Sequence, residues 1–473
     1  MGTISTAFNM ISQALDADQQ ALNVVANNVA NANTPGYTEE TPDWQENAPL
    51  DVNGTLVGQG VTETGATSQR DRVLESRMDQ QQQLESSTGS RLTALNTLQA
   101  LFTPDSGTTS SEAGDIGTDI TNFFDSFSSL EANSTDNSLR QAVLSSAGTL
   151  AGDISNAAAS LNEQRSALDQ ETAGVAGQIN SLVSAIAQLN VQIQSTSPNA
   201  DAGTLEDQRQ YNISQLSQLV GINQITSNNN GLAITTTSGQ LLVSDGTSYT
   251  LNTGMVNGVT DFFLGNEDIT TQLASGGGSL GGELTARDQD IPGALDALNQ
   301  LAYSISTAVN TQNNAGTDLD GNTGTAKAPL NIFNQPEAVA GSAVNMSVVM
   351  TDPNQIAAAG LGDGTGDNSN AVALAALGSQ EIVSGQTPIN YYSNFVTTLG
   401  STVSNVQTEN TAQAASVTQL QTQSDALSGV NLNDEASSMT TYERAYQSAA
   451  QVFTMLNNII NSALNLGEPT TVS

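Results

Sequence analysis

The segment ANNVANANTPGYT, residues 26–38, ends the predicted N-terminal helix and decides how the fold begins. Asparagine costs a helix interior roughly 0.5–0.7 kcal/mol relative to alanine. This short segment nevertheless contains Asn27, Asn28, Asn31 and Asn33. The helix is predicted to stop at Thr34-Pro35-Gly36, because proline and glycine suit the two central positions of a type II turn. So many weak helix formers in one helix indicate that their amide groups have another use.

The composition excludes several classes of chemistry. The chain has 473 residues, which is enough for roughly two to four domains, and contains neither cysteine nor histidine. Disulfides, thiol nucleophiles, imidazole bases and nearly all zinc sites are therefore excluded. With 10 Lys+Arg against 47 Asp+Glu, the formal charge is −37, which disfavours nucleic acid and anionic membranes as partners. We expect no catalytic, cofactor-binding or metal-binding residues, no nucleic-acid partner and no membrane insertion.

Both ends of the chain are predicted to be single helices that carry one narrow apolar stripe. In each helix an apolar residue recurs every three or four positions. The N-terminal stripe consists of Ile4, Phe8, Ile11, Leu15, Leu22, Val25 and Val29. The C-terminal stripe consists of Met439, Tyr442, Tyr446, Ala449, Phe453, Leu456 and Ile460. The C-terminal helix is expected to end at Gly467, a residue suited to a C-cap.

Few charges flank these stripes. Only Asp16 and Asp18 are ionised within residues 1–38, and residues 445–467 carry no charge. Because a solvated helix normally has charged faces, we infer that the two helices lie side by side and become buried when copies pack together. Asn23, Asn27 and Asn31 share one helical face, and their amides are expected to hydrogen-bond neighbouring copies. The alternative is an ordinary surface helix end with asparagine capping.

Two further helical stripes lie inside the chain. The first is broken by a helix-to-helix turn at residues 195–203 and consists of Leu168, Val175, Ile179, Leu182, Ile186, Leu189, Ile193, Ile213, Leu216 and Val220. The second consists of Leu399, Val403, Val406, Val417, Leu420 and Leu427. Residues 231–251 instead have β-branched runs separated by Ser-Gly and Asp-Gly, which predicts hairpins. Residues 341–352 are also strand-like, and the glycine-rich stretches 276–282 and 360–366 are predicted to be linkers.

The expected fold class is mainly α with an inserted β-rich portion, in an elongated multidomain α+β chain. The terminal helices would pair as a coiled-coil-like assembly domain. We assign this domain to residues 1–37 plus 434–473, a long-helix rod domain to 38–220, 280–318 and 370–433, a β-rich domain to 221–279, and an outer β/loop segment to 319–369.

The two ends of the chain resemble the axial proteins of the bacterial flagellum. The N-terminal motif is paired with SGVNLNDEASSMTTYERAYQSAAQVFTMLNNIINSALNL (428–466), which carries the acidic pair Asp434-Glu435 and the AYQ element at 445–447. Internal segments resemble the hook-associated members of this family, at residues 139–161, 205–222, 281–310 and 315–324. The aromatic pair that members often carry after DLDGNTG is absent. The sequence TPGY (34–37) is more typical of rod and hook proteins. A hook or distal-rod protein is therefore one alternative, and an extracellular adhesin or a glycan-active enzyme are weaker ones.

The resemblance implies a structural protein without a substrate, joining hook to filament outside the cell. Axial proteins are exported through the flagellar type III apparatus without a cleaved signal, and residues 1–20 lack the features of a signal peptide. The implied partners are like subunits, the hook protein on one side, a second junction protein or flagellin on the other, and an export chaperone. The expected assembly interface is Ile4, Phe8, Ile11, Leu15, Leu22, Val25, Asn27, Val29, Asn31, Met439, Tyr442, Tyr446, Phe453, Leu456 and Ile460.

Two internal motifs resemble ligand sites only in part. DLDGNTG (318–324) has the start of an EF-hand loop, but Pro329 occupies the slot of the required glutamate. We predict a turn in which aspartate and asparagine cap their own backbone, with calcium as the alternative. GGGSLGG (276–282) lacks the lysine of a phosphate-binding loop.

Overall fold

The structure is a computed structural model that describes residues 2–52, 54–102, 115–196, 201–226 and 230–465. It divides into two compact units. The first unit comprises Met1–Gln83, Gln178–Leu251 and Gln413–Ser473, and the second comprises Leu84–Gly177 and Asn252–Ala412. Three long helices contribute residues to both units: α2 (Arg72–Ala100), α4 (Asn137–Thr196) and α10 (Pro388–Ser428).

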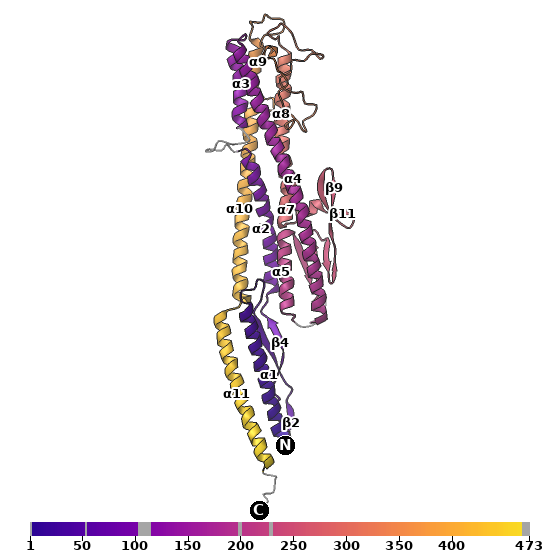
Figure 1. The fold of residues 1–473 in the computed structure, drawn as a ribbon, viewed down its shortest axis with the longest axis vertical. Coiled ribbons are helices and arrows are strands. Elements are labelled where there is room, and N and C mark those ends of the chain that lie inside the picture. The colour runs from indigo at the N-terminus through magenta and orange to yellow at the C-terminus, as the bar shows by residue number, and fades with distance from the viewer. Residues whose placement is uncertain (1, 53, 103–114, 197–200, 227–229, 466–473) are drawn as a thin grey trace, which may run out of the picture. The chain divides into compact units, whose positions relative to one another are not determined.

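The first unit pairs the two ends of the chain. Helices α1 (Gly2–Asn31) and α11 (Leu432–Asn465) lie side by side and run antiparallel (Figure 1), and the rings of Phe8 and Phe453 are 4.6 Å apart. After α1 the Tyr37 N–H donates to the Thr34 carbonyl at 3.1 Å, and Gly36 has a φ of +78°. The predicted pairing of the terminal helices and the predicted type II turn are both confirmed. The predicted end of the last helix at Gly467 lies outside the described residues.

A β hairpin that the sequence analysis did not predict follows this turn. Strand β1 (Glu40–Glu46) pairs antiparallel with β4 (Val61–Ser68), and the short strands β2 (Leu50–Val52) and β3 (Thr55–Val57) pair between them. The register shifts between Asp43 and Trp44, which marks a bulge. The Trp44 ring meets Tyr442 edge-on at 5.8 Å, so the hairpin contacts α11.

A four-stranded antiparallel sheet completes the first unit. It follows α5 (Thr204–Leu219) and has the order β5 (Ile222–Thr226), β6 (Leu232–Thr236), β7 (Leu241–Ser244) and β8 (Thr247–Ser248). The hairpins predicted within residues 231–251 are thereby confirmed. Asn190 on α4 donates to the carbonyls of Leu232 and Asp245, at 2.9 and 2.8 Å, and so fastens the sheet to the helix.

The core of the second unit lies among long helices. These are α2, α3 (Ile116–Ala132), α4, α8 (Ile291–Asn314) and α10. The Phe123 ring packs against Phe127 and Phe333, with ring centroids 5.3 and 5.4 Å away. The remaining elements are β9 (Leu251–Val256), β10 (Val259–Leu264), β11 (Glu267–Asp268), α6 (Thr270–Ala274), α7 (Gly278–Thr285), the π-helical turn η1 (Ala286–Asp290), α9 (Ser369–Ala376), and the 3-10 turns η2 (Pro353–Gln355) and η3 (Leu377–Ser379).

The two internal apolar stripes are largely confirmed. On α4 and α5 every predicted residue except the half-buried Leu182 is buried. On α10, Leu399, Val403 and Val406 are buried, whereas Leu427 is 58% exposed. The stripe therefore stops short of the end of the helix.

Two buried side chains hold the irregular chain between α8 and α9. The Arg140 guanidinium donates to the carbonyls of Ser134 and Ile356, each at 2.6 Å. One Asp318 oxygen accepts the N–H groups of Asp320 and Asn322 at 3.0 and 2.7 Å, and the other accepts from the Asn322 side chain. The predicted self-capped turn at residues 318–324 is confirmed.

The predicted linker at residues 276–282 is wrong. Its glycines begin the buried helix α7, which packs against backbone. A Cβ atom on Gly282 would collide with the Ser87 carbonyl, and one on Gly281 would lie 3.0 Å from the Leu273 carbonyl. Glycine is needed here for close packing rather than for flexibility.

The strand predicted at residues 341–352 is also wrong. The segment forms one isolated bridge, between Val348 and Phe333, and its apolar side chains cover helices instead of joining a sheet. Ala343 and Met346 are buried in the core, and the Ala343 N–H donates to the Asn299 side chain on α8 at 2.9 Å. Alternating apolar residues can serve either arrangement, so the pattern alone was ambiguous.

Candidate assembly interface

The most buried face of α1 consists of small side chains and one asparagine. Ala17, Ala21, Val25 and Asn28 are each 5% exposed or less. Their spacing of four, four and three places them on one side of the helix. Four residues of the predicted stripe are half-buried: Phe8, Ile11, Leu15 and Leu22. Val29, expected in the stripe, is 45% exposed, and the Ile4 side chain lies outside the described part.

Asn28 joins the two ends of the chain. Its Nδ2 donates to Glu435 Oε1 and to the Glu40 carbonyl, both at 2.8 Å. Its Oδ1 accepts the Tyr37 hydroxyl at 2.7 Å and the Glu40 N–H at 3.0 Å. An amide side chain has two N–H donors and two acceptor lone pairs, so this buried group is fully satisfied. The N-terminal asparagine motif and the C-terminal acidic pair thus meet at one residue.

The neighbouring asparagines also bond within the chain. Asn31 Nδ2 donates to Asn27 Oδ1 at 2.8 Å, and Asn27 Nδ2 donates to the Tyr37 hydroxyl at 3.3 Å. That Asn27 and Asn31 also hydrogen-bond neighbouring copies remains a prediction. These amides stabilise the helix end and the turn that follows it.

Buried carboxylates surround this network. Burial raises the pKa of Glu435, and the hydrogen bond from Asn28 opposes that shift. Burial and the charge of Asp207 raise the pKa of Glu40. The TPGYT segment docks on α5, where Asp207 accepts the Thr38 N–H at 3.1 Å and the Thr38 hydroxyl at 2.8 Å. Arg70 forms ion pairs with Asp207 and Glu206 and balances part of this charge.

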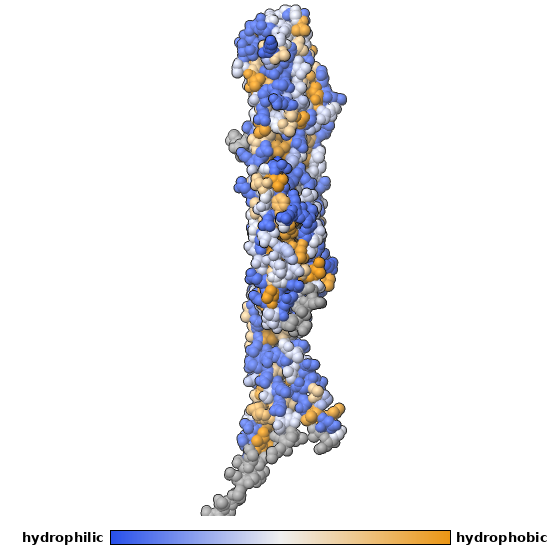
Figure 2. All heavy atoms as spheres, turned by 90° about the vertical axis from the view of Figure 1, so that its right-hand side faces the viewer, coloured by the Kyte–Doolittle hydropathy of each residue, from blue (hydrophilic) through white to orange (hydrophobic). Residues whose placement is uncertain are grey.

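Helix α11 presents two apolar faces. Tyr442, Phe453, Leu456 and Ile460 are half-buried, as their place in the predicted stripe implies, whereas Met439 and Tyr446 are 46% and 36% exposed. We define the outer stripe as Val452, Met455 and Ile459, which are 41%, 59% and 53% exposed. Their spacing of three and four places them on one face. Figure 2 shows small apolar groups at the level of α1 and α11.

Four features of this region were not predicted as part of the site: Asn28, Tyr37, Glu435 and the outer stripe. Asn28 and Glu435 both lie in the quoted motifs, but they are 407 positions apart and nothing local pairs them.

None of the helices within the described ranges is both long and apolar enough to span a bilayer.

Family models match three parts of the chain. The flagellar hook-associated protein FlgK helical domain matches residues 106–326, the flagella basal body rod protein matches 8–38, and the flagellar basal body rod FlgEFG protein C-terminal matches 422–466. Flagellar hook-associated protein 1 of Escherichia coli is 27% identical over 98% of this chain and 100% of its own length. The chain is similar to flagellar hook-associated protein 1 along nearly its whole length.

Other relatives agree with this assignment. Flagellar hook-associated protein 1 of Bacillus subtilis is 25% identical over 96% of each chain. The solved structure of the flagellar hook junction protein FlgK from Burkholderia pseudomallei has the same fold, with a TM-score of 0.64 and 20% identity. That match covers 74% of this chain and 99% of the other. The chain is a structural component of the bacterial flagellum that acts at the hook–filament junction, and the adhesin alternative is not supported.

Proposed function

We propose that this protein polymerises through the paired helices α1 and α11, and that each copy buries the outer stripe of α11 against its neighbours. The observation that carries the proposal is the exposure of this stripe: Met455 and Ile459 are 59% and 53% exposed on a helix that carries no charge after Arg444 within its bounds. An exposed helix face that is apolar and uncharged gains free energy when another surface covers it.

The partners follow from the family. We propose that like subunits form a layer with the hook protein on one side and a second junction protein or flagellin on the other. Export through the flagellar type III apparatus, with a chaperone, would bring the chain to this extracellular position. The protein would have no catalytic role, and the absence of histidine and cysteine supports this view. The bounds of the four predicted domains remain predictions.

The test replaces one exposed methionine by aspartate. Met455→Asp should leave the melting temperature of the isolated protein unchanged, because the side chain is already solvated. In the assembled layer the unpaired charge would cost on the order of several kcal/mol per copy. Cells carrying this variant should build hooks, secrete unpolymerised flagellin into the medium and fail to swim.

A matched control separates the site from the chemistry. Met255 on β9 is 68% exposed, and Met255→Asp should preserve swimming. Val25 would be a poorer choice, because it is only 3% exposed and aspartate there would disturb the helix pair itself. Normal filaments on cells with Met455→Asp would refute the proposed role of the stripe.

A further inference from the structure

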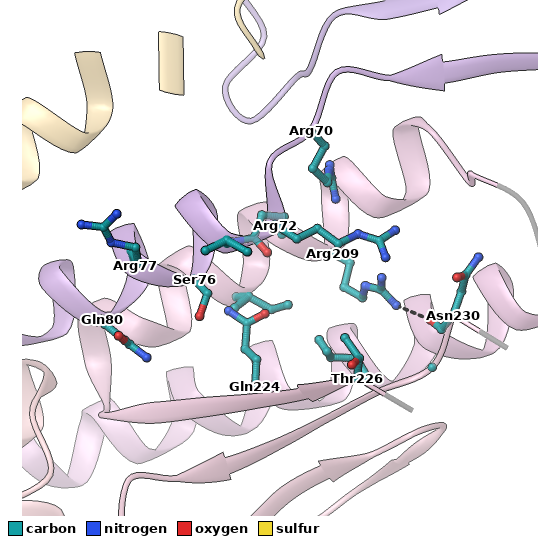
Figure 3. Close-up of a pocket in the computed structure, with 14 residues that line it drawn as sticks. Arg70, Arg72, Ser76, Arg77, Gln80, Arg209, Gln224, Thr226 and Asn230 are labelled. Atoms are coloured by element: carbon teal, nitrogen blue, oxygen red, sulfur yellow. Dashed lines mark hydrogen bonds between the residues drawn. The ribbon is translucent and has the colours of Figure 1, made fainter. Parts of the chain in front are cut away.

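Positive charge is concentrated in one pocket of the first unit. The chain has 10 Lys+Arg, and Arg70, Arg72, Arg77 and Arg209 all line a cavity of about 360 Å³ beside α2, α5 and β5 (Figure 3). None of the 14 described residues that line this cavity is an aspartate or a glutamate. We call it the arginine pocket.

The four guanidinium groups differ in how far they are already neutralised. The Arg70 side chain is 7% exposed and pairs with Glu206 and Asp207, which do not line the pocket. Arg209 is 8% exposed and donates to the Asn190 side chain and the Asn230 carbonyl, at 3.0 and 2.8 Å. It forms no ion pair with any described residue. The Glu206 and Glu75 carboxylates interact with this cation without forming an ion pair. A buried guanidinium that hydrogen-bonds only neutral oxygens favours an incoming anion.

Two arginines remain accessible from solvent. The Arg72 side chain is 57% exposed and bonds Glu206 at 2.8 Å on one edge. Arg77 is exposed, and it makes no ion pair within the part of the chain that the structure describes. Polar side chains such as Ser76, Gln80 and Gln224 line the same pocket (Figure 3). Guanidinium groups and neutral donors of this kind bind carboxylates well.

A matching acidic surface lies on the same chain. Residues 1–69 contain no lysine or arginine, and their acidic residues are Asp16, Asp18, Glu39, Glu40, Asp43, Glu46, Asp51 and Glu63. Of these, Asp43, Glu46 and Asp51 are exposed on the β1–β4 hairpin, which we call the acidic hairpin. Copies with a charge of −37 repel one another, so an assembly gains most where such a surface meets the arginine pocket.

We propose that the arginine pocket of one copy receives the acidic hairpin of a second copy, with Arg72 and Arg77 meeting the carboxylates of Asp43 and Glu46. This inference rests on the proposed self-assembly. Two different patches then meet head to tail, and such a heterologous contact generates rings or helical arrays rather than closed pairs. The contact would therefore also orient each copy in the layer.

The absence of native cysteine makes cross-linking a direct test. Cells would express two variants together, Gln80→Cys beside the pocket and Gln45→Cys on the hairpin, which leave all the charges in place. Oxidation of isolated flagella should produce a cross-linked dimer of this chain only when both variants are present. In the matched control, Ala326→Cys replaces Gln80→Cys at an exposed site of the second unit and should give no dimer.

Charge reversal gives a second readout. Arg77→Glu in the Gln80→Cys copy should lower the yield of dimer at least several-fold, and Asp43→Arg in the Gln45→Cys copy should restore it. Absence of a dimer while the chain is present in the flagella would overturn the arginine-pocket contact alone. Absence of the chain from the flagella would overturn the proposed function instead. Stabilisation of the isolated chain by inorganic phosphate, abolished by Arg77→Ala, would assign the pocket to a free anion if no dimer forms.

Discussion

At the scale of single residues, Asn28 explains why a helix tolerates the asparagine-rich motif. Its side chain replaces an apolar contact by four hydrogen bonds that reach α11, the turn after α1 and the first strand. A buried amide is favourable only when every donor and acceptor is satisfied. The cost of asparagine in the helix is offset by a specific connection between the two ends of the chain.

Removal of this side chain should loosen α11. Asn28→Ala would leave the Tyr37 O–H without its acceptor and Glu435 Oε1 without its donor, at about 1–3 kcal/mol for each buried group left unpaired. We expect amide hydrogen exchange in residues 432–465 to accelerate at least tenfold, with little change in the core of the second unit. The matched control Asn23→Ala, at an exposed position of α1, should not change exchange there. Equal exchange in both variants would contradict the role given to Asn28.

At the scale of elements, α7 shows how a glycine-rich segment can become a buried helix that carries a charge. Glu283 is 6% exposed, and its Oε2 has no hydrogen-bond partner among the described residues. Burial, followed by the charge of Glu171, raises the pKa of Glu283 from 4.5 to about 7. The folded state therefore binds a proton that the unfolded state releases between these two values. The stability contributed by this group is complete below pH 4.5 and is lost as the pH rises through 7.

Glu283→Gln should remove this dependence. The melting temperature of the variant should equal that of the native protein at pH 4.5 and exceed it at pH 8. The reason is that the neutral amide keeps the shape of the side chain without the buried charge. Roughly 2–4 °C of increase is expected for each kcal/mol recovered. Thermal melts from pH 4.5 to 8 measure the difference, and Glu337→Gln, at an exposed site, is the control. A constant difference across this range would show that Glu283 does not titrate as described.

Elements with periodic apolar residues could be predicted from the sequence, and elements that depend on distant partners could not. The stripe from Leu168 to Ile193 requires only local spacing, and it was found. The strand β1 has the sequence ETPDWQE, where proline and acidic residues give little strand propensity. Its pairing with β4 and the contact of Trp44 with Tyr442 hold it in place. The glycines of α7 were wrongly predicted to form a linker, because glycine is needed there to let the backbone of α2 pack closely. That tertiary contact cannot be seen in the local sequence.

The assembly interface could likewise be predicted only in part from the sequence. The pairing of the first and last helices followed from two uncharged stripes. The outer stripe of Val452, Met455 and Ile459 was missed because α11 carries two apolar faces. Spacing alone does not show which of the two faces packs within the same chain and which stays exposed. The hydrogen bond of Asn27 within the chain was not predicted, because its partner Tyr37 lies beyond the end of the helix.

At the scale of the whole molecule, the assembly element is built from both ends of the chain. The unit that contains α1 also contains α11, while most of the intervening sequence folds into the rest of the protein. Helix α1 also contacts β1 and β4, but its partner helix is present only when residues 432–465 are. Isolated helices with one narrow stripe are marginal in water, so the element forms only in the complete chain.

The most direct test of the central claim measures burial of the outer stripe upon assembly. Met455→Cys places the only thiol of the chain on this stripe, and Met255→Cys places it at an exposed control site of the second unit. Both isolated proteins should react rapidly with a maleimide dye. In assembled flagella the Met455→Cys thiol should be protected by at least tenfold in rate, while the Met255→Cys thiol keeps reacting. Equal labelling of Met455→Cys before and after assembly would contradict polymerisation through this face of α11.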